Sequence, residues 1–237
     1  MAEGTKMEAF IEGLRDGGCE FVANYPGTYS QDIFFKLGGD RISINEKTAF
    51  ERAYGVSLAG KRSLVTMKNV GLNTCADPYL HSVITGVNGG FVVVVTDDTK
   101  VTGSQEREDS RHFIDFFGGL WLEPNDHQSA YTAGYDAFEL SEKLDIPITI
   151  RLSSQFFGAS ADRYQRNAPR RIASLAKKSP EKMIAYPIYW KRQADNLLHK
   201  NKRISEYVER QYAGVVRGES HLSVIACGDC TDEMATV

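Results

Sequence analysis

Two kinds of apolar pattern alternate along the first 155 residues of the chain. In one, apolar side chains recur three and four positions apart, which places them on one side of a helix. In the other, short apolar runs are continuous, as in strands buried on both faces of a sheet. The first pattern predicts helices over residues 6–15, 30–37, 46–58, 79–85, 106–117 and 125–144. The second predicts strands over residues 20–23, 42–44, 62–67, 89–98, 120–122 and 146–152.

The order of these elements indicates the fold class. Strands alternate with helices, and no hairpin signal joins two strands directly. This alternation is typical of a parallel sheet with helices on both faces and right-handed crossovers. We therefore expect an α/β domain over residues 1–158.

The alternation ends after Gly158. A basic linker containing Pro169 follows, and a long polar helix is predicted from about residue 189 to 212. The last segment, HLSVIACGDCTDEMATV, begins a new strand-turn-helix unit. We expect a linker over 159–218 and an incomplete α/β unit over 219–237, which either continues in a longer protein or pairs with another subunit.

Composition and charge narrow the classes of protein. No apolar run approaches the roughly 20 residues that span a bilayer, and the first residues lack a secretory signal. Four cysteines do not form a disulfide framework, so a cytoplasmic protein is expected. Residues 160–218 carry 14 Lys and Arg against 5 Asp and Glu. This basic segment favours contact with an acidic partner or with the acidic body itself over nucleic acid.

Two stretches carry candidate chemistry. Glu46 follows the predicted helix cap Asn45, where an acidic residue ordinarily complements the helix dipole. If buried instead, the carboxylate could share a proton with a ring nitrogen. Residues 68–71 are predicted as a loop after a strand, and Lys68, Asn69 and Asn73 beside Gly71 are either anion-binding or solvated.

Other motifs give weaker signals. Thr28, next to Gly27 in a Pro-Gly turn, offers a hydroxyl group or simply caps the next helix. The pair Asp97 and Asp98 suits magnesium, but no third ligand stands at a fixed spacing, so solvated loop carboxylates are expected. Cys227 and Cys230 match a redox C-x-x-C pattern that coincidence also explains. The sequence has no G-x-x-x-x-G-K-[ST] phosphate loop, no G-x-G-x-x-G and no cysteine ladder for an iron–sulfur cluster.

A family resemblance runs through these stretches. Residues 45–78 read NEKTAFERAYGVSLAGKRSLVTMKNVGLNTCADP, accompanied by YPGT, GGFVVVVTDD, SQEREDSR and LEPNDHQSAYTAGYDAFELSEKLDIPITIR. Together they resemble the pyrimidine-binding domain of thiamine-diphosphate-dependent 2-oxoacid:ferredoxin oxidoreductases, above all the large subunit of indolepyruvate:ferredoxin oxidoreductase. The likeness covers about residues 6–155.

The resemblance implies roles for individual residues. Glu46 would bind N1′ of the aminopyrimidine of thiamine diphosphate and favour its imino tautomer. The positions expected to contact the cofactor are Gly27, Thr28, Lys68, Asn69, Gly71 and Asn73. Those expected to contact the substrate are Thr28, Tyr29 and Gln105.

The resemblance also implies partners. The family holds the diphosphate and Mg²⁺ on another domain marked by G-D-G, whereas here Gly228 and Asp229 are followed by Cys230. The active site would therefore be completed by a diphosphate-binding subunit. A ferredoxin-like or cluster-bearing subunit with iron–sulfur clusters, coenzyme A and a 2-oxoacid are the other implied partners, in oxidative decarboxylation to an acyl-CoA.

The chain departs from the family pattern at three places. Tyr29, Ser30 and Gln31 stand where Pro-Ser-Ser is usual, Asn69 stands for His, and residues 102–107 read TGSQER for His-Ser-Ser-Gln-Asn-Glu. These positions border the expected pocket, so the substrate is predicted only as an aryl or branched 2-oxoacid. The alternatives are a subunit of a non-oxidative decarboxylase or carboligase, and a non-catalytic scaffold subunit.

Overall fold

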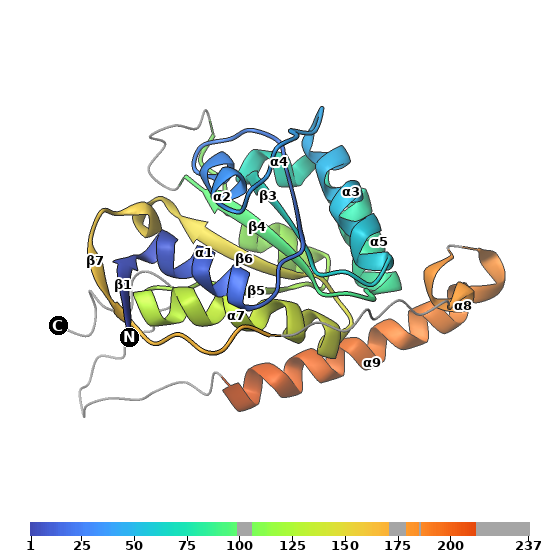
Figure 1. Ribbon diagram of the computed structural model, residues 1–237. Coiled ribbons are helices and arrows are strands. Elements are labelled where there is room, and N and C mark those ends of the chain that lie inside the picture. Colours follow the sequence, from blue (N-terminus) through green and yellow to red (C-terminus); the bar gives the residue numbers. More distant parts are fainter. Residues whose placement is uncertain (99–105, 171–178, 185, 212–237) are drawn as a thin grey trace, which may run out of the picture.

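The centre of the molecule is a five-stranded parallel sheet with the strand order β2-β3-β4-β6-β5 (Figure 1). The computed structural model describes residues 1–98, 106–170, 179–184 and 186–211. The strands are β2 (Phe21–Asn24), β3 (Ser63–Lys68), β4 (Phe91–Asp97), β5 (Leu120–Leu122) and β6 (Ile148–Ser153). The sequence prediction of a parallel α/β sheet is confirmed.

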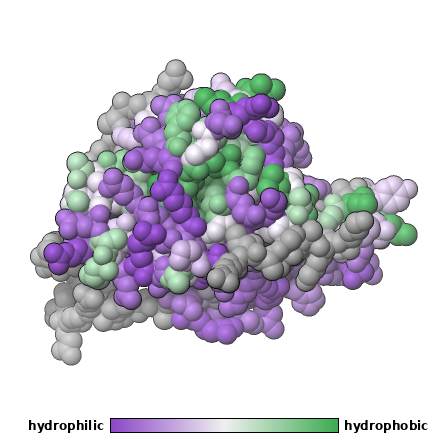
Figure 2. Space-filling model, viewed as in Figure 1, coloured by the Kyte–Doolittle hydropathy of each residue, from purple (hydrophilic) through white to green (hydrophobic). Residues whose placement is uncertain are grey.

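The central strand β4 is buried along its whole length, because both neighbours pair with it and helices cover both faces. The helices are α1 (Lys6–Asp16), α2 (Ser30–Lys36), α3 (Glu46–Leu58), α5 (Ala76–Thr85), α6 (Ser110–Phe116) and α7 (His127–Leu144). Right-handed crossovers place α3, α5 and α6 on one face, and the reversed step from β5 to β6 places α7 with α1 on the other (Figure 1). Hydrophilic side chains cover most of the surface over α1 and α7 (Figure 2).

A second, two-stranded sheet was not predicted. It pairs β1 (Ala2–Thr5) with β7 (Ala161–Tyr164) in antiparallel register. The chain then runs back along α1 and α7, where the main-chain N–H of Arg170 donates to the carbonyl oxygen of Asp16 at 2.8 Å. The first residues and those after 160 are therefore held together on the body.

The arm that follows contains α8 (Pro180–Met183) and the long helix α9 (Pro187–Gln211), close to the predicted range of 189–212. Helix α9 packs against α5 and α7 through one side, on which Gln193 and Lys200 are buried. Among the described residues, no helix combines the length and the hydropathy needed to cross a membrane.

Three local predictions are wrong. Residues 42–44 form no strand: the N–H of Ser43 donates to the oxygen of Asn24 at 2.9 Å, and Ile44 is exposed. Residues 69–71 are not loop, since α4 (Asn69–Thr74) begins directly after β3, and burial of Leu72 outweighs the poor helix propensity of Asn and Gly. The helix expected from residue 106 begins at Ser110, because Asp109 caps it.

Candidate active site

The sequence-predicted residues gather at the carboxyl edge of the sheet. All five central strands are parallel, so their last residues and the loops after them lie along one edge. Glu46 begins α3 at this edge, Lys68 ends β3, and Thr28 lies between β2 and α2. In open α/β sheets this edge is the usual place for a ligand.

The carboxylate of Glu46 lies in the first turn of α3 without an ion-pair partner among the described residues. The helix cap itself is made by Asn45, whose side chain accepts the N–H of Thr48 at 2.7 Å. Glu46 is half-buried, and it forms no hydrogen bond or ion pair with the residues that the structure describes. A Cβ added to Gly71 would lie 2.5 Å from Cγ and 2.7 Å from Oε1 of Glu46, so the side chain rests on the backbone of α4.

The Pro-Gly turn after β2 crosses the ends of β3 and β4. A Cβ on Gly27 would lie 2.8 Å from Cβ of Lys68, and the hydroxyl of Thr96 donates to the carbonyl oxygen of Thr28 at 2.8 Å. Tyr29 has a φ of 64°, which is unusual for a residue other than glycine. Close packing on β3 and the bond from β4 thus fix this turn beside Lys68.

Asn69 is the buried polar residue of this edge that most needs a partner. It is fully buried, and neither its amide oxygen nor its amide nitrogen has a hydrogen-bond partner in the described part of the chain. A buried amide left unsatisfied costs about 1–3 kcal/mol, and such groups are rare in folded proteins. Asn69 is therefore suited to bind a group that both donates and accepts hydrogen bonds.

The other predicted residues lie farther out or outside the described ranges. Asn73 is exposed, and its Nδ2 donates to Oε2 of Glu108 at 3.2 Å. Tyr29 stacks on Phe157 of the short helix η1 (Ser154–Phe157), with ring centroids 4.2 Å apart. Gln105, Cys227, Gly228, Asp229 and Cys230 lie outside the residues that the structure describes.

The expectation that Asp97 is a solvated loop carboxylate is wrong. Asp97 is 1% exposed, and its Oδ2 accepts a hydrogen bond from Nε of Arg151 at 2.6 Å. Sequence reasoning missed Arg151, although an arginine inside the apolar run of β6 is a signal for a buried acidic partner. Within the described residues, no group of three His, Cys, Asp or Glu side chains is placed to hold a metal ion.

The ionisable groups near this edge have pKa values that are shifted in different directions. Burial raises the pKa of Glu108, against the opposing hydrogen bond from Asn73. The hydrogen bond from Arg111 lowers the pKa of Asp109 to about 2. Burial raises the pKa of Cys75 to about 12, and the nearby Glu46 charge acts in the same direction. Cys75 is therefore a protonated thiol at neutral pH and no nucleophile.

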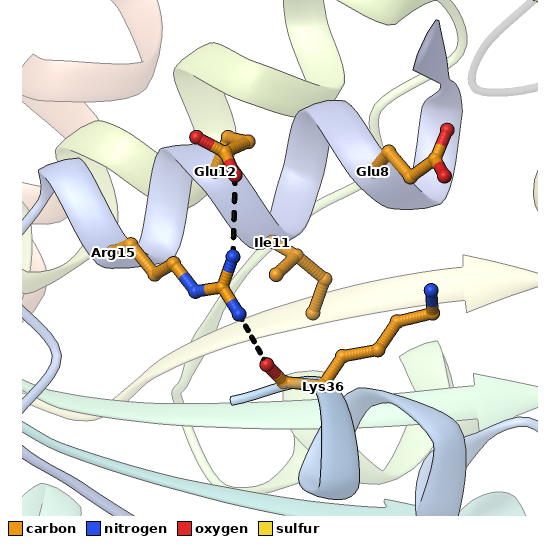
Figure 3. A pocket seen from close by; sticks show the side chains of 5 residues that line it. All are labelled: Glu8, Ile11, Glu12, Arg15 and Lys36. Carbon is orange, nitrogen blue, oxygen red and sulfur yellow. Dashed lines mark hydrogen bonds and ion pairs between the residues drawn. The ribbon is translucent and has the colours of Figure 1, made fainter. Parts of the chain in front are cut away.

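A small polar hollow lies elsewhere, between α1 and the end of α2 (Figure 3). Its lining residues are Glu8, Ile11, Glu12, Arg15 and Lys36. Arg15 donates to Oε1 of Glu12 at 3.2 Å and to the carbonyl oxygen of Lys36, so its guanidinium is already paired (Figure 3). None of the predicted site residues lines this hollow, and it is not the candidate site.

Comparisons with known proteins give relatives over almost the whole chain. No protein-family model matches it. It is 33% identical over 96% of its length to the indolepyruvate oxidoreductase subunit IorA of Archaeoglobus fulgidus, and 32% identical over 93% to that of Methanothermobacter marburgensis. The chain spans only 40% and 38% of the length of these two relatives.

Two solved structures share the fold. A 2-oxoglutarate:ferredoxin oxidoreductase from Magnetococcus marinus, solved with 2-oxoglutarate, coenzyme A and succinyl-CoA bound, matches 87% of this chain and 45% of its own, with a TM-score of 0.66 and 16% identity. A thiamine diphosphate-dependent 4-hydroxybenzoylformate decarboxylase from Rhodococcus jostii matches 87% of this chain and 37% of its own, with a TM-score of 0.57 and 16% identity. At such identities the likeness shows the fold alone.

Proposed function

We propose that this chain, which is 33% identical to the indolepyruvate oxidoreductase subunit IorA of Archaeoglobus fulgidus, is the pyrimidine-binding subunit of a split thiamine-diphosphate enzyme. The reaction would be oxidative decarboxylation of an aryl or branched 2-oxoacid to an acyl-CoA, with electrons passing to ferredoxin. The observation that carries the proposal is the half-buried carboxylate of Glu46, which rests on Gly71 and has no partner in the described part of the chain.

The residues at the carboxyl edge fit an aminopyrimidine ring. Glu46 offers a carboxylate that can hold or share one proton with a ring nitrogen. Asn69 offers an amide nitrogen that donates and an amide oxygen that accepts, and neither atom has a partner among the described residues. Gly71 lets the backbone of α4 come close to Glu46, where a larger residue would fill the space. These side chains match the hydrogen-bonding pattern of such a ring.

The chain's own residues would bind and orient, while bound thiamine diphosphate supplies the electron sink for breaking the bond to the substrate carboxylate. Glu46 would hold or share a proton with a ring nitrogen of the bound cofactor. Lys68 and Thr28 would bind the anionic substrate, because the packing of Gly27 on Lys68 brings the turn and the end of β3 together. Tyr29 and Gln105 stay predictions for the substrate side.

The remaining parts of the enzyme are proposed to reside outside this chain. Gly228 and Asp229 are followed by Cys230 rather than Gly, so we propose that the diphosphate and Mg²⁺ are held outside residues 1–237. The iron–sulfur clusters are expected on a ferredoxin-like or cluster-bearing subunit. The division into residues 1–158, 159–218 and 219–237 also stays a prediction.

Binding of thiamine diphosphate to this chain mixed with its diphosphate-binding partner tests the proposal. Glu46→Gln should weaken the affinity measured by calorimetry at least about tenfold, since a hydrogen bond to a charged group contributes about 1.5–3 kcal/mol. Glu51→Gln is the matched control, because Glu51 lies on the same helix but is exposed, and it forms a long ion pair with Lys47 at 3.9 Å. Equal affinity for wild type and Glu46→Gln would contradict the proposal.

The products separate the oxidative reaction from its alternatives. Acyl-CoA formed together with reduced ferredoxin supports oxidative decarboxylation. An aldehyde or a carboligation product formed without reduction of ferredoxin would indicate the non-oxidative class. Binding of neither cofactor nor 2-oxoacid by the complex would leave the scaffold subunit as the remaining alternative.

A further inference from the structure

A buried ion-pair network joins three strands at the carboxyl edge. Arg151 on β6 is 3% exposed, and its Nε donates to Oδ2 of Asp97, the last residue of β4, at 2.6 Å. Its Nη1 donates to Oε1 of Glu123, the residue after β5, at 2.5 Å. One guanidinium group therefore ties together the ends of β4, β5 and β6.

The network continues into the segment that precedes α6. Oδ2 of Asp97 also accepts the N–H of Ser110 at 3.1 Å and its hydroxyl at 3.0 Å. Asp109 lies 3.8 Å from Nε of Arg151 and is bound by Arg111, which in turn reaches Glu123 at 3.6 Å. The start of α6 and the residues just before it are thus anchored to the sheet.

Stability alone does not account for such an arrangement. Removing two charges from water is costly, and apolar side chains of similar size often replace a buried ion pair with no loss of stability. The second oxygen of Asp97, Oδ1, is also buried and lacks a hydrogen-bond partner among the described residues. The paired charges do fix the orientation of the segments they join, because the planar guanidinium group sets the angles at which its partners bind.

The fixed segment contacts α4, which supports Glu46. Glu108, two residues before Ser110, accepts a hydrogen bond from Asn73 of α4, and Gly71 of α4 lies against Glu46. We infer that Arg151 is a positioning residue of the carboxyl-edge site, which through Asp97 and the segment at Glu108 holds α4 against Glu46. The inference rests on the proposed function for the role of Glu46, but not for the coupling between Arg151 and α4.

The chain offers a matched control at the opposite edge of the sheet. Arg62, just before β3, is 7% exposed and binds both carboxylate oxygens of Glu142 at 2.7 Å. Arg62→Met and Arg151→Met therefore each break a buried arginine–carboxylate contact, and both are expected to lower the unfolding temperature. Of the two substitutions, only Arg151→Met should loosen the attachment of α4 to the body.

Amide hydrogen exchange of residues 69–74 in the isolated chain is the first measurement. Arg151→Met should speed this exchange about tenfold and Arg62→Met no more than about twofold, because local opening follows the contacts that hold a segment. Arg151→Lys keeps the positive charge but loses the planar guanidinium group that binds two carboxylates at once. Its effect on the exchange of residues 69–74 should therefore lie between those of wild type and Arg151→Met. Equal exchange of α4 in the Arg151→Met and Arg62→Met variants would overturn the inference.

Affinity for thiamine diphosphate in the complex with the diphosphate-binding partner is the second measurement. Arg151→Met should weaken it about tenfold, since small misplacement of a binding group has large effects, while Arg62→Met should leave it unchanged. If Arg151→Met does not fold, Glu123→Gln takes its place, and unchanged exchange in α4 then overturns the inference. Failure of the wild-type complex to bind the cofactor would refute the proposed function, while the exchange measurement still decides the role of Arg151.

Discussion

At the scale of single residues, the contact between Gly71 and Glu46 sets the geometry of the site. A methyl group at position 71 would lie 2.5 Å from Cγ and 2.7 Å from Oε1 of Glu46, so Gly71→Ala must displace that side chain. Overpacking costs typically 1–3 kcal/mol, and we expect about 1 kcal/mol because the half-buried carboxylate can move. Affinity for thiamine diphosphate should fall much more than stability does. Urea unfolding of the chain and calorimetry on the complex measure the two effects.

Gly55 provides the control for this substitution. It lies in the last third of α3, is exposed, and an added Cβ would meet no atom within 4 Å. Gly55→Ala should therefore stabilise the chain by about 0.5–1 kcal/mol through helix propensity, with no change in cofactor affinity. A Gly71→Ala variant that behaves like Gly55→Ala would show that Glu46 does not depend on the close approach of α4.

At the scale of elements, the sequence predicted what is encoded locally. The helix over 46–58 has the predicted bounds, because Asn45 is a strong cap and the apolar spacing is regular. The short helix α4 could not be predicted, since Asn and Gly disfavour helix and only packing against the body forms it. The burial of Asn69 was missed for the same reason. Residues 42–44 are strand-like in sequence, but they meet the edge strand β2 only through the bond from the N–H of Ser43 to the oxygen of Asn24, which is too little to make a strand.

The pairing of distant elements lay beyond the sequence in another way. Arg151 and Asp97 are far apart in the chain and meet only because β6 inserts between β4 and β5. Nothing in the spacing of apolar residues specifies that strand order. The candidate site could therefore be predicted at Glu46, where resemblance marked a residue, but not in the buried network that surrounds it.

Helix α9 is attached by a buried lysine, which gives a prediction for a single element. Nζ of Lys200 donates to the carbonyl oxygens of Val83 and Ile84 at 3.0 and 3.1 Å and lies 3.2 Å from Oδ2 of Asp145. Burial lowers the pKa of Lys200, because removing its charged ammonium group from water costs free energy. Lys200→Met should destabilise the chain by about 1–3 kcal/mol, because acceptors at the end of α5 lose their donor.

Amide exchange along α9 and thermal unfolding measure this effect. Exchange in α9 should rise more than exchange in the central sheet, since the lysine joins the helix to the body. Lys202→Met is the control, because Lys202 is exposed on the same helix and pairs with none of the described residues. Equal exchange in the two variants would mean that apolar packing alone holds α9 in place.

At the scale of the whole molecule, the uneven charge distribution is in part satisfied internally. The sequence predicted that the basic segment lies on an acidic partner or on the body. In the described residues, Arg166 binds both oxygens of Asp16 at 2.9 Å, and Arg170 binds Asp136 at 2.7 Å while stacking on Tyr135. Lys182 binds Asp145 at 2.5 Å. Part of the positive charge of the basic segment is thereby paired with the protein's own carboxylates.

This internal pairing predicts how stability depends on salt. The double variant Arg166→Gln and Arg170→Gln should lose about 1–3 kcal/mol at low ionic strength, mainly because Asp16 is buried and loses its charged partner. The loss should shrink in concentrated salt, where the screening length falls to about 3 Å, but persist in part because buried pairs are screened less. The double variant Lys191→Gln and Lys202→Gln removes the same charge from exposed positions on α9 and should change stability by less than about 0.5 kcal/mol. Thermal unfolding at low and high salt distinguishes the two pairs. Equal effects would mean that the basic segment contributes only net charge, and its contacts with the body would then have no part in holding the chain together.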